Sequence, residues 1–77
     1  MQTQQIQQPL PKLVPGSKEY EIASRLCHGE DQKFIASEMG ISIQLVKYYI
    51  GKLHETYKAN NSTHLVAILL TCGAFEK

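Results

Sequence analysis

The sequence predicts an all-α fold built from four short helices. Apolar residues recur at three- and four-residue spacing in four stretches, and each stretch is followed by glycine or asparagine, which end helices readily. No stretch shows the alternating apolar and polar pattern of a strand. A chain of 77 residues makes one small domain that buries roughly 60% of its unfolded surface, so dimerisation would add useful stability.

The first fifteen residues are expected to stand apart from this domain. Five of the first eight residues are glutamine, and three of the next seven are proline. Such a composition does not bury enough apolar surface to fold. We therefore expect residues 1–15 to form a disordered tail, with an arm that touches DNA or a partner as the alternative, and residues 16–77 to form the folded domain.

Two short helices open the predicted domain. The first is expected over residues 18–28, with Gly29 providing the exit, and the second over 32–39, ending at Gly40. Their expected N-caps are Ser17 (or Gly16) and Asp31. The side chains expected to face the core are Ile22, Ala23, Leu26, Ile35, Ala36 and Met39.

Two further helices complete the domain. The third is expected over residues 43–57 behind Ser42, and the fourth over about 63–72 behind Ser62 and before Gly73. The expected core residues of the third helix are Val46, Ile50, Leu53 and Tyr57.

Residues 32–51 carry the packing positions of a helix-turn-helix. Ala36 is small enough for two helices to approach closely, and Gly40 turns the chain four residues later. Val46 then fills the angle between the helices. This spacing predicts a helix-turn-helix rather than an ordinary helical hairpin, with the third helix as the reading helix.

The side of the third helix opposite its core residues is the candidate DNA-reading surface. At 100° per residue, four residues share that side and two lysines flank it. Glutamine pairs with adenine, tyrosine packs on a thymine methyl or bonds a phosphate, glutamate accepts from cytosine, and lysine reaches phosphate. The candidate DNA-binding residues are Gln44, Lys47, Tyr48, Gly51, Lys52 and Glu55.

These residues resemble the LuxR/FixJ-type helix-turn-helix domain, the module of GerE-like regulators. The resemblance runs from about Lys18 to Leu69 and rests on the segments 18–22 and 34–42, on the Val46-Lys47 pair, and on the closing segment 65–67. It implies a four-helix unit that dimerises through its last helix and binds inverted-repeat DNA, with the third helix in the major groove.

Several positions depart from that family pattern. Leu45 stands where threonine is usual, Asn60 where arginine is frequent, and Tyr48-Tyr49 where smaller polar and histidine-type residues are usual. Pro15-Gly16 replaces the opening leucine and threonine. Each departure removes a possible phosphate contact, which leaves room for a domain that captures another regulator instead of DNA.

The last helix is apolar in almost every direction, so one face alone does not use all of its apolar side chains. Surplus apolar surface on a terminal helix indicates an interface, most simply a two-fold homodimer. The candidate dimer residues are Leu65, Val66, Ile68, Leu69 and Cys72.

Charge and motif content narrow the functional classes. From Ser17 onward seven basic residues meet seven acidic ones, but residues 42–60 carry three lysines against one glutamate, so the third helix is the positive part. The spacing of cysteine and histidine fits no metal site, and no nucleophile or phosphate-loop motif occurs, so we expect no enzyme, cofactor or metal. The absence of a leader or membrane-spanning pattern leads us to expect a cytoplasmic protein without membrane contact.

Together these features predict a sequence-specific DNA-binding transcription regulator that acts as a homodimer on an inverted repeat. The alternative is a helix-turn-helix antagonist that binds a larger transcription regulator through protein contacts.

Overall fold

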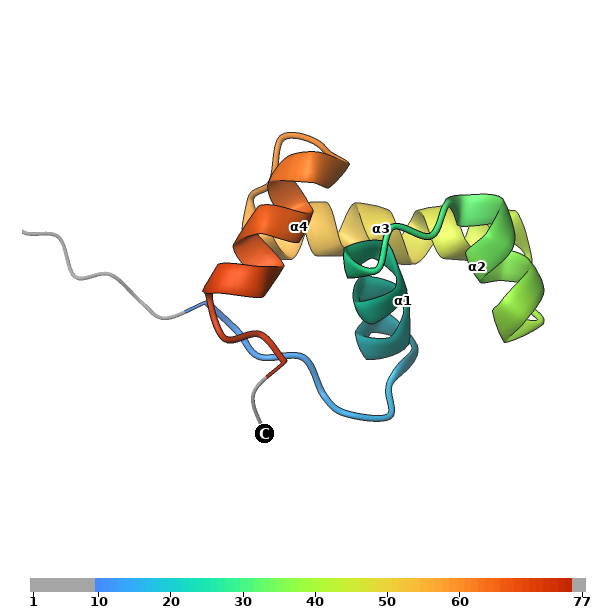
Figure 1. Ribbon diagram of the computed structural model, residues 1–77, viewed down its shortest axis with the longest axis horizontal. Helices are drawn as coiled ribbons and strands as arrows, with labels where there is room; N and C mark the ends of the chain where they lie inside the picture. Colours follow the sequence, from blue (N-terminus) through green and yellow to red (C-terminus); the bar gives the residue numbers. More distant parts are fainter. Residues whose placement is uncertain (1–9, 76–77) are drawn as a thin grey trace, which may run out of the picture.

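The computed structural model describes residues 10–75, and within that range it contains four helices and no strand (Figure 1). The helices are α1 (Lys18–Cys27), α2 (Gln32–Met39), α3 (Ile43–Tyr57) and α4 (Ser62–Thr71). This confirms the predicted all-α, four-helix class and places the boundaries within one residue of the expected ones. No helix in residues 10–75 is long and apolar enough to cross a membrane.

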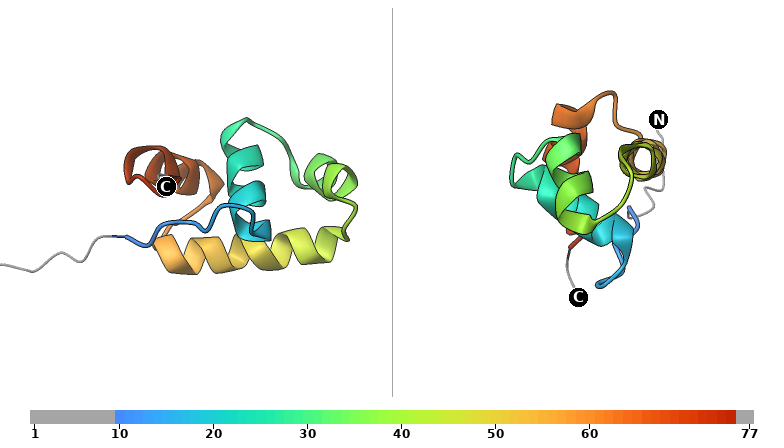
Figure 2. Two further views of the ribbon diagram at one scale, coloured as in Figure 1. Left: turned by 90° about the horizontal axis from the view of Figure 1, so that it is seen from below. Right: turned by 90° about the vertical axis from the view of Figure 1, so that its right-hand side faces the viewer.

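The longest helix, α3, organises the other three. It packs against α1, α2 and α4, and these three lie on one side of it, as the left view of Figure 2 shows. The opposite side of α3 is left uncovered along its length. The fold therefore presents one helix with a long open face.

Each helix begins at a side-chain cap. Asn61, rather than the predicted Ser62, caps α4, because its side chain accepts a hydrogen bond from the backbone N–H of His64 at 2.8 Å. Ser62 thereby becomes the first residue of that helix. The predicted caps of the other three helices are confirmed at Ser17, Asp31 and Ser42.

The turn between α2 and α3 has the geometry that the sequence predicts. Gly40 adopts φ 67° and ψ 34°, in the left-handed region that glycine enters without steric cost. The N–H of Ile41 then bonds to the carbonyl of Ala36 at 3.1 Å and closes the end of α2. Ala36 is 8% exposed and Val46 is fully buried, so both contribute to the core where the two helices meet.

All four helices contribute to one hydrophobic core. Leu26 and Met39, expected inside, are only half-buried and pack at its margin, because the innermost space is filled by their neighbours. The buried residues of the helices are Ile22, Ala23, Ile35, Ala36, Val46, Ile50, Leu53, Tyr57, Leu65 and Leu69.

The segment before α1 belongs to the packed domain, which corrects the expected boundary at Gly16. Leu13 is only 8% exposed, and its N–H donates to the carbonyl of Ala74 at 2.7 Å. The hydroxyl of Tyr57 donates to the carbonyl of Pro11, also at 2.7 Å. Burial of the Leu13 side chain offsets the entropy of ordering this short stretch. The rest of the expected tail, residues 1–9, lies outside the described residues.

Candidate nucleic-acid interface

The open face of α3 carries the predicted reading residues. Because Val46, Ile50, Leu53 and Tyr57 all point into the core, the opposite side of the helix faces solvent. The structure brings four of the predicted residues together on that side, and Tyr48 is 58% exposed there. These four exposed residues, Gln44, Tyr48, Gly51 and Glu55, are called the α3 stripe below.

Gly51 makes the middle of the α3 stripe flat. A Cβ built on Gly51 would have no neighbouring heavy atom within 4 Å, so the position faces open space. Its backbone is helical, without the positive φ that would itself require glycine. The absent side chain lets a flat surface approach the helix backbone closely.

Lys47 borders a hollow where the N-terminal ends of α2 and α3 meet. The hollow has a volume of about 370 Å³ and is also lined by Lys33, Asp31, Gln32 and Ile43. Lys33 was not among the residues predicted from the sequence, although its place in the first turn of α2 is a usable signal. Two lysines against one aspartate leave this rim positive, as contact with a phosphate backbone requires.

Lys52, the second predicted flanking lysine, is held by a carboxylate of α1. Its Nζ lies 3.4 Å from Oε2 of Glu19 and 5.6 Å from the centre of the Tyr48 ring. The hydrogen bond with Glu19, followed by the influence of Tyr48, raises the pKa of Lys52 above its usual value. The two flanking lysines therefore differ, because Lys52 already has an anionic partner within the protein.

Tyr48 and Tyr49 are not equivalent despite being adjacent. Tyr49 is half-buried and packs against the core, whereas Tyr48 points outward, and their rings meet edge-on at 5.4 Å. Of the aromatic pair that replaces the usual family residues, only Tyr48 belongs to the α3 stripe.

Two of the predicted dimer residues are unavailable for an interface. Leu65 is 0% exposed and Leu69 is 1% exposed, because α4 turns both toward α1 and α3. Val66, Ile68 and Cys72 keep partial exposure.

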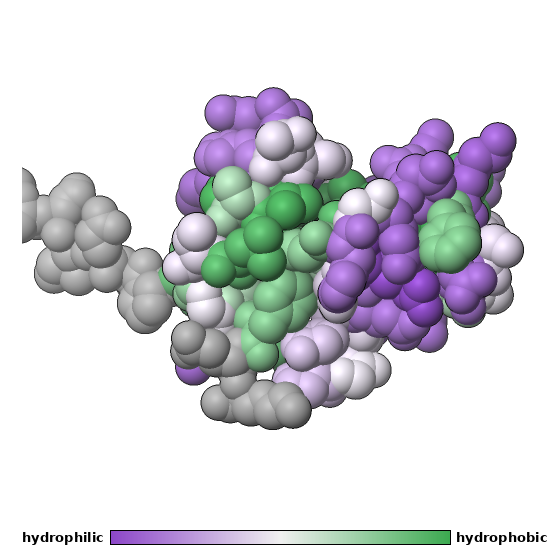
Figure 3. Space-filling view, in the orientation of Figure 1, coloured by the Kyte–Doolittle hydropathy of each residue, from purple (hydrophilic) through white to green (hydrophobic). Residues whose placement is uncertain are grey.

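The outer face of α4 nevertheless carries a large apolar side chain, Leu70, which is not among the candidate dimer residues although it lies on the same side of the helix as Val66. Leu70 is 63% exposed and, with Gly73 and Phe75, lines a shallow hollow. Figure 3 shows apolar surface gathered over α4, whereas the surface over α2 is mainly polar. At 100° per residue Leu70 lies well to one side of Leu65 and Leu69, so the packing that buries those two residues leaves Leu70 in solvent.

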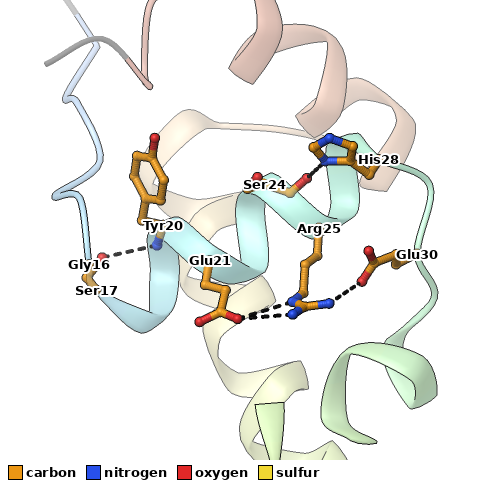
Figure 4. Close-up of a pocket in the computed structure, with 8 residues that line it drawn as sticks. All are labelled: Gly16, Ser17, Tyr20, Glu21, Ser24, Arg25, His28 and Glu30. Atoms are coloured by element: carbon orange, nitrogen blue, oxygen red, sulfur yellow. Dashed lines mark hydrogen bonds and ion pairs between the residues drawn. The ribbon is translucent and has the colours of Figure 1, made fainter. Parts of the chain in front are cut away.

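A third hollow, about 470 Å³ in volume, lies along α1 (Figure 4). Arg25 crosses it and forms ion pairs with Glu21 at 3.2 Å and with Glu30 at 2.9 Å. Hydrogen bonding to Glu30, and then to Glu21, raises the pKa of Arg25. The guanidinium thus joins α1 to the loop before α2, which suits a structural role better than an anion site.

Cysteine and histidine form no metal centre in the part of the chain that the structure describes. No three potential ligands from His, Cys, Asp and Glu lie close enough together to hold a metal ion. Both cysteines are free thiols, and burial raises the pKa of the Cys27 thiol.

Comparison with known protein families identifies the family to which the helical domain belongs. The GerE family, described as "Bacterial regulatory proteins, luxR family", matches residues 16–69, which is more than half of the chain. The match includes the helix-turn-helix and most of α4 but leaves Leu13 and Ala74 outside. In a comparison with curated proteins, none matched the chain. The chain therefore belongs to the LuxR family of bacterial regulatory proteins, a family of DNA-binding transcription regulators.

Proposed function

We propose that this protein is a sequence-specific transcription regulator that binds an inverted-repeat DNA site as a homodimer, with α3 in the major groove. The proposal is supported by the exposed α3 stripe, which lies beside Lys33 and Lys47. These two lysines line the hollow between the N-terminal ends of α2 and α3, called the α2–α3 hollow below. A helix of this kind fits the major groove, which is about 12 Å wide.

The α3 stripe supplies groups suited to base edges. Gln44 follows the N-terminus of α3 by one residue, where base contacts of a reading helix concentrate. Its amide pairs with adenine, the Tyr48 ring packs on a thymine methyl, and the Glu55 carboxylate accepts from cytosine. Gly51 brings the helix backbone close to the groove floor.

Phosphate contact is assigned to the rim of the α2–α3 hollow. Lys47 and Lys33 come from two helices and border one space, so both reach the same wall of the groove. These contacts fix the register of α3 on the duplex but carry no sequence information themselves.

The homodimer is assigned to the outer face of α4. Val66 and the exposed Leu70 supply apolar area, and Ala67 between them is small enough for two helices to approach. A two-fold axis through this face brings the same patch of the two subunits into contact. To bind successive half-sites, the two α3 helices of such a dimer need to lie about 34 Å apart, one turn of DNA.

Substitution of Lys47 tests the proposal. Lys47→Ala should weaken binding to every duplex sequence and reduce the slope of log Kobs against log salt by about 0.9, because one phosphate contact is lost. Lys47→Arg, which keeps the charge, should retain the wild-type slope. Wild-type affinity and slope in Lys47→Ala would overturn the assignment.

The second candidate function is an antagonist that captures a larger transcription regulator. Phe34 favours it, because this aromatic side chain is 49% exposed on the outer side of α2 and adds nothing to the α3 stripe. A wild-type protein that shifts no DNA at low salt would replace the leading proposal with this one.

A further inference from the structure

Lys52 projects from α3 and pairs with a carboxylate of α1. Its ammonium group contacts the Glu19 carboxylate at 3.4 Å and lies over the Tyr48 ring. The lysine and glutamate side chains are 47% and 33% exposed, so water reaches both members of the pair. Such a pair can exchange one partner for another without breaking the core.

The Glu19–Lys52 pair lies in a hollow on one flank of α3. Glu19 and Lys52 line a hollow of about 170 Å³ between α3 and the segment before α1, and Lys12 lines the same hollow. The hollow therefore holds one carboxylate and two ammonium groups.

We propose that Glu19 limits the DNA affinity of this regulator by competing with a backbone phosphate for Lys52. In the wild type Lys52 keeps Glu19 as its partner when the protein is on DNA, and it reaches a phosphate oxygen only when the Glu19 carboxylate is removed or drawn back. This inference rests on the proposed function and adds to it a residue of α1 that sets affinity without touching DNA.

The ion pair with Glu19 offsets much of the free energy that Lys52 would gain from a phosphate contact. A lysine that is free in solution gains the full benefit of counterion release when it reaches a phosphate. A lysine that must first leave a carboxylate loses that ion pair, and the carboxylate left behind also repels the nearby phosphate. The contribution of Lys52 to binding is therefore smaller than that of Lys47, although both flank the α3 stripe.

Glu19→Gln tests the competition directly. Binding is measured by fluorescence anisotropy on a labelled duplex of arbitrary sequence over a range of salt concentrations, since a phosphate contact does not depend on sequence. We expect an affinity about threefold higher than wild type and a slope of log Kobs against log salt about 0.9 steeper. In a Lys52→Ala background the same substitution should no longer steepen the slope.

Two control variants separate this effect from net charge. Glu21→Gln removes an equal charge from the same helix, but Glu21 pairs with Arg25, so the slope should stay at the wild-type value. Glu19→Asp keeps the charge and shortens the side chain, and should still steepen the slope. Thermal melting of each variant shows whether it is folded.

The outcomes distinguish the two proposals. An equal gain in Glu19→Gln and Glu21→Gln, or an unchanged slope in Glu19→Gln and Glu19→Asp, overturns the competition while DNA binding stands. Absence of DNA binding in the wild type and in every variant overturns the proposed function and, with it, this inference.

Discussion

Leu13→Ala tests whether the segment before α1 is part of the domain. Leu13 is 8% exposed, and truncation of a buried leucine to alanine costs about 2–5 kcal/mol. Because Leu13 lies at the edge of the core, where neighbours can close over a cavity, we expect about 2 kcal/mol. Domains of this size have a free energy of unfolding of only several kcal/mol, so the loss should be large.

Urea denaturation followed by circular dichroism measures this loss. With an m value of about 1 kcal/mol/M, a loss of about 2 kcal/mol lowers the unfolding midpoint by about 2 M. Val14→Ala is the matched control, because Val14 is adjacent and 68% exposed, and its effect should stay within about 0.5 kcal/mol. Equal midpoints for the two variants would show that the segment is not anchored and would refute the reasoning.

Three further predictions concern the exposed side of α3, the outer face of α4 and the hydrogen bond between Tyr57 and Pro11. Gly51→Ala should stabilise the fold by about 0.5–1 kcal/mol, because alanine favours a helix and its methyl group meets only solvent in the free protein. The same methyl group should weaken DNA binding, because it keeps the α3 backbone away from the groove. Stronger DNA binding would contradict the placement of Gly51 in the interface. Leu70→Glu should give a folded monomer in analytical ultracentrifugation, and a wild type that is monomeric at high concentration would contradict the α4 dimer. Tyr57→Phe should cost about 1 kcal/mol by removing the bond to Pro11. Burial, with a smaller influence of Cys72, raises the pKa of Tyr57 above 10.0, so the unfolded wild type loses the tyrosine proton at a lower pH than the folded protein does. The difference in unfolding free energy between wild type and Tyr57→Phe, measured by urea denaturation, should therefore shrink as pH rises through 10. A difference that stays constant would contradict the pKa shift.

Local sequence signals were sufficient to predict the helices and the turn. Capping side chains, a glycine at the end of α2 and apolar residues at helical spacing act within a few residues of one another, and they placed the helices correctly, although Asn61 rather than Ser62 caps α4 and Leu26 and Met39 lie only at the margin of the core. The open side of α3 followed from the same spacing, because a helix that buries Val46, Ile50 and Leu53 must expose the opposite side.

Contacts between distant parts of the chain were not predictable in this way. Leu13 joins the core and bonds to Ala74, which lies far from it in the sequence, and a proline-rich composition gives no sign of that pairing. The Glu19–Lys52 pair likewise joins α1 to α3, so its formation depends on how the two helices pack. On α4, apolar residues surround the axis, and only the packing shows that Leu69 points inward and Leu70 outward.

The most direct test of the central claim is selection of bound sequences from random DNA by the purified protein. A homodimer that reads DNA with α3 should enrich an inverted repeat whose half-sites are about 34 Å apart, with adenine frequent where Gln44 reaches the base edges. Selected sequences that share no common motif, or no bound DNA at low salt, would contradict it.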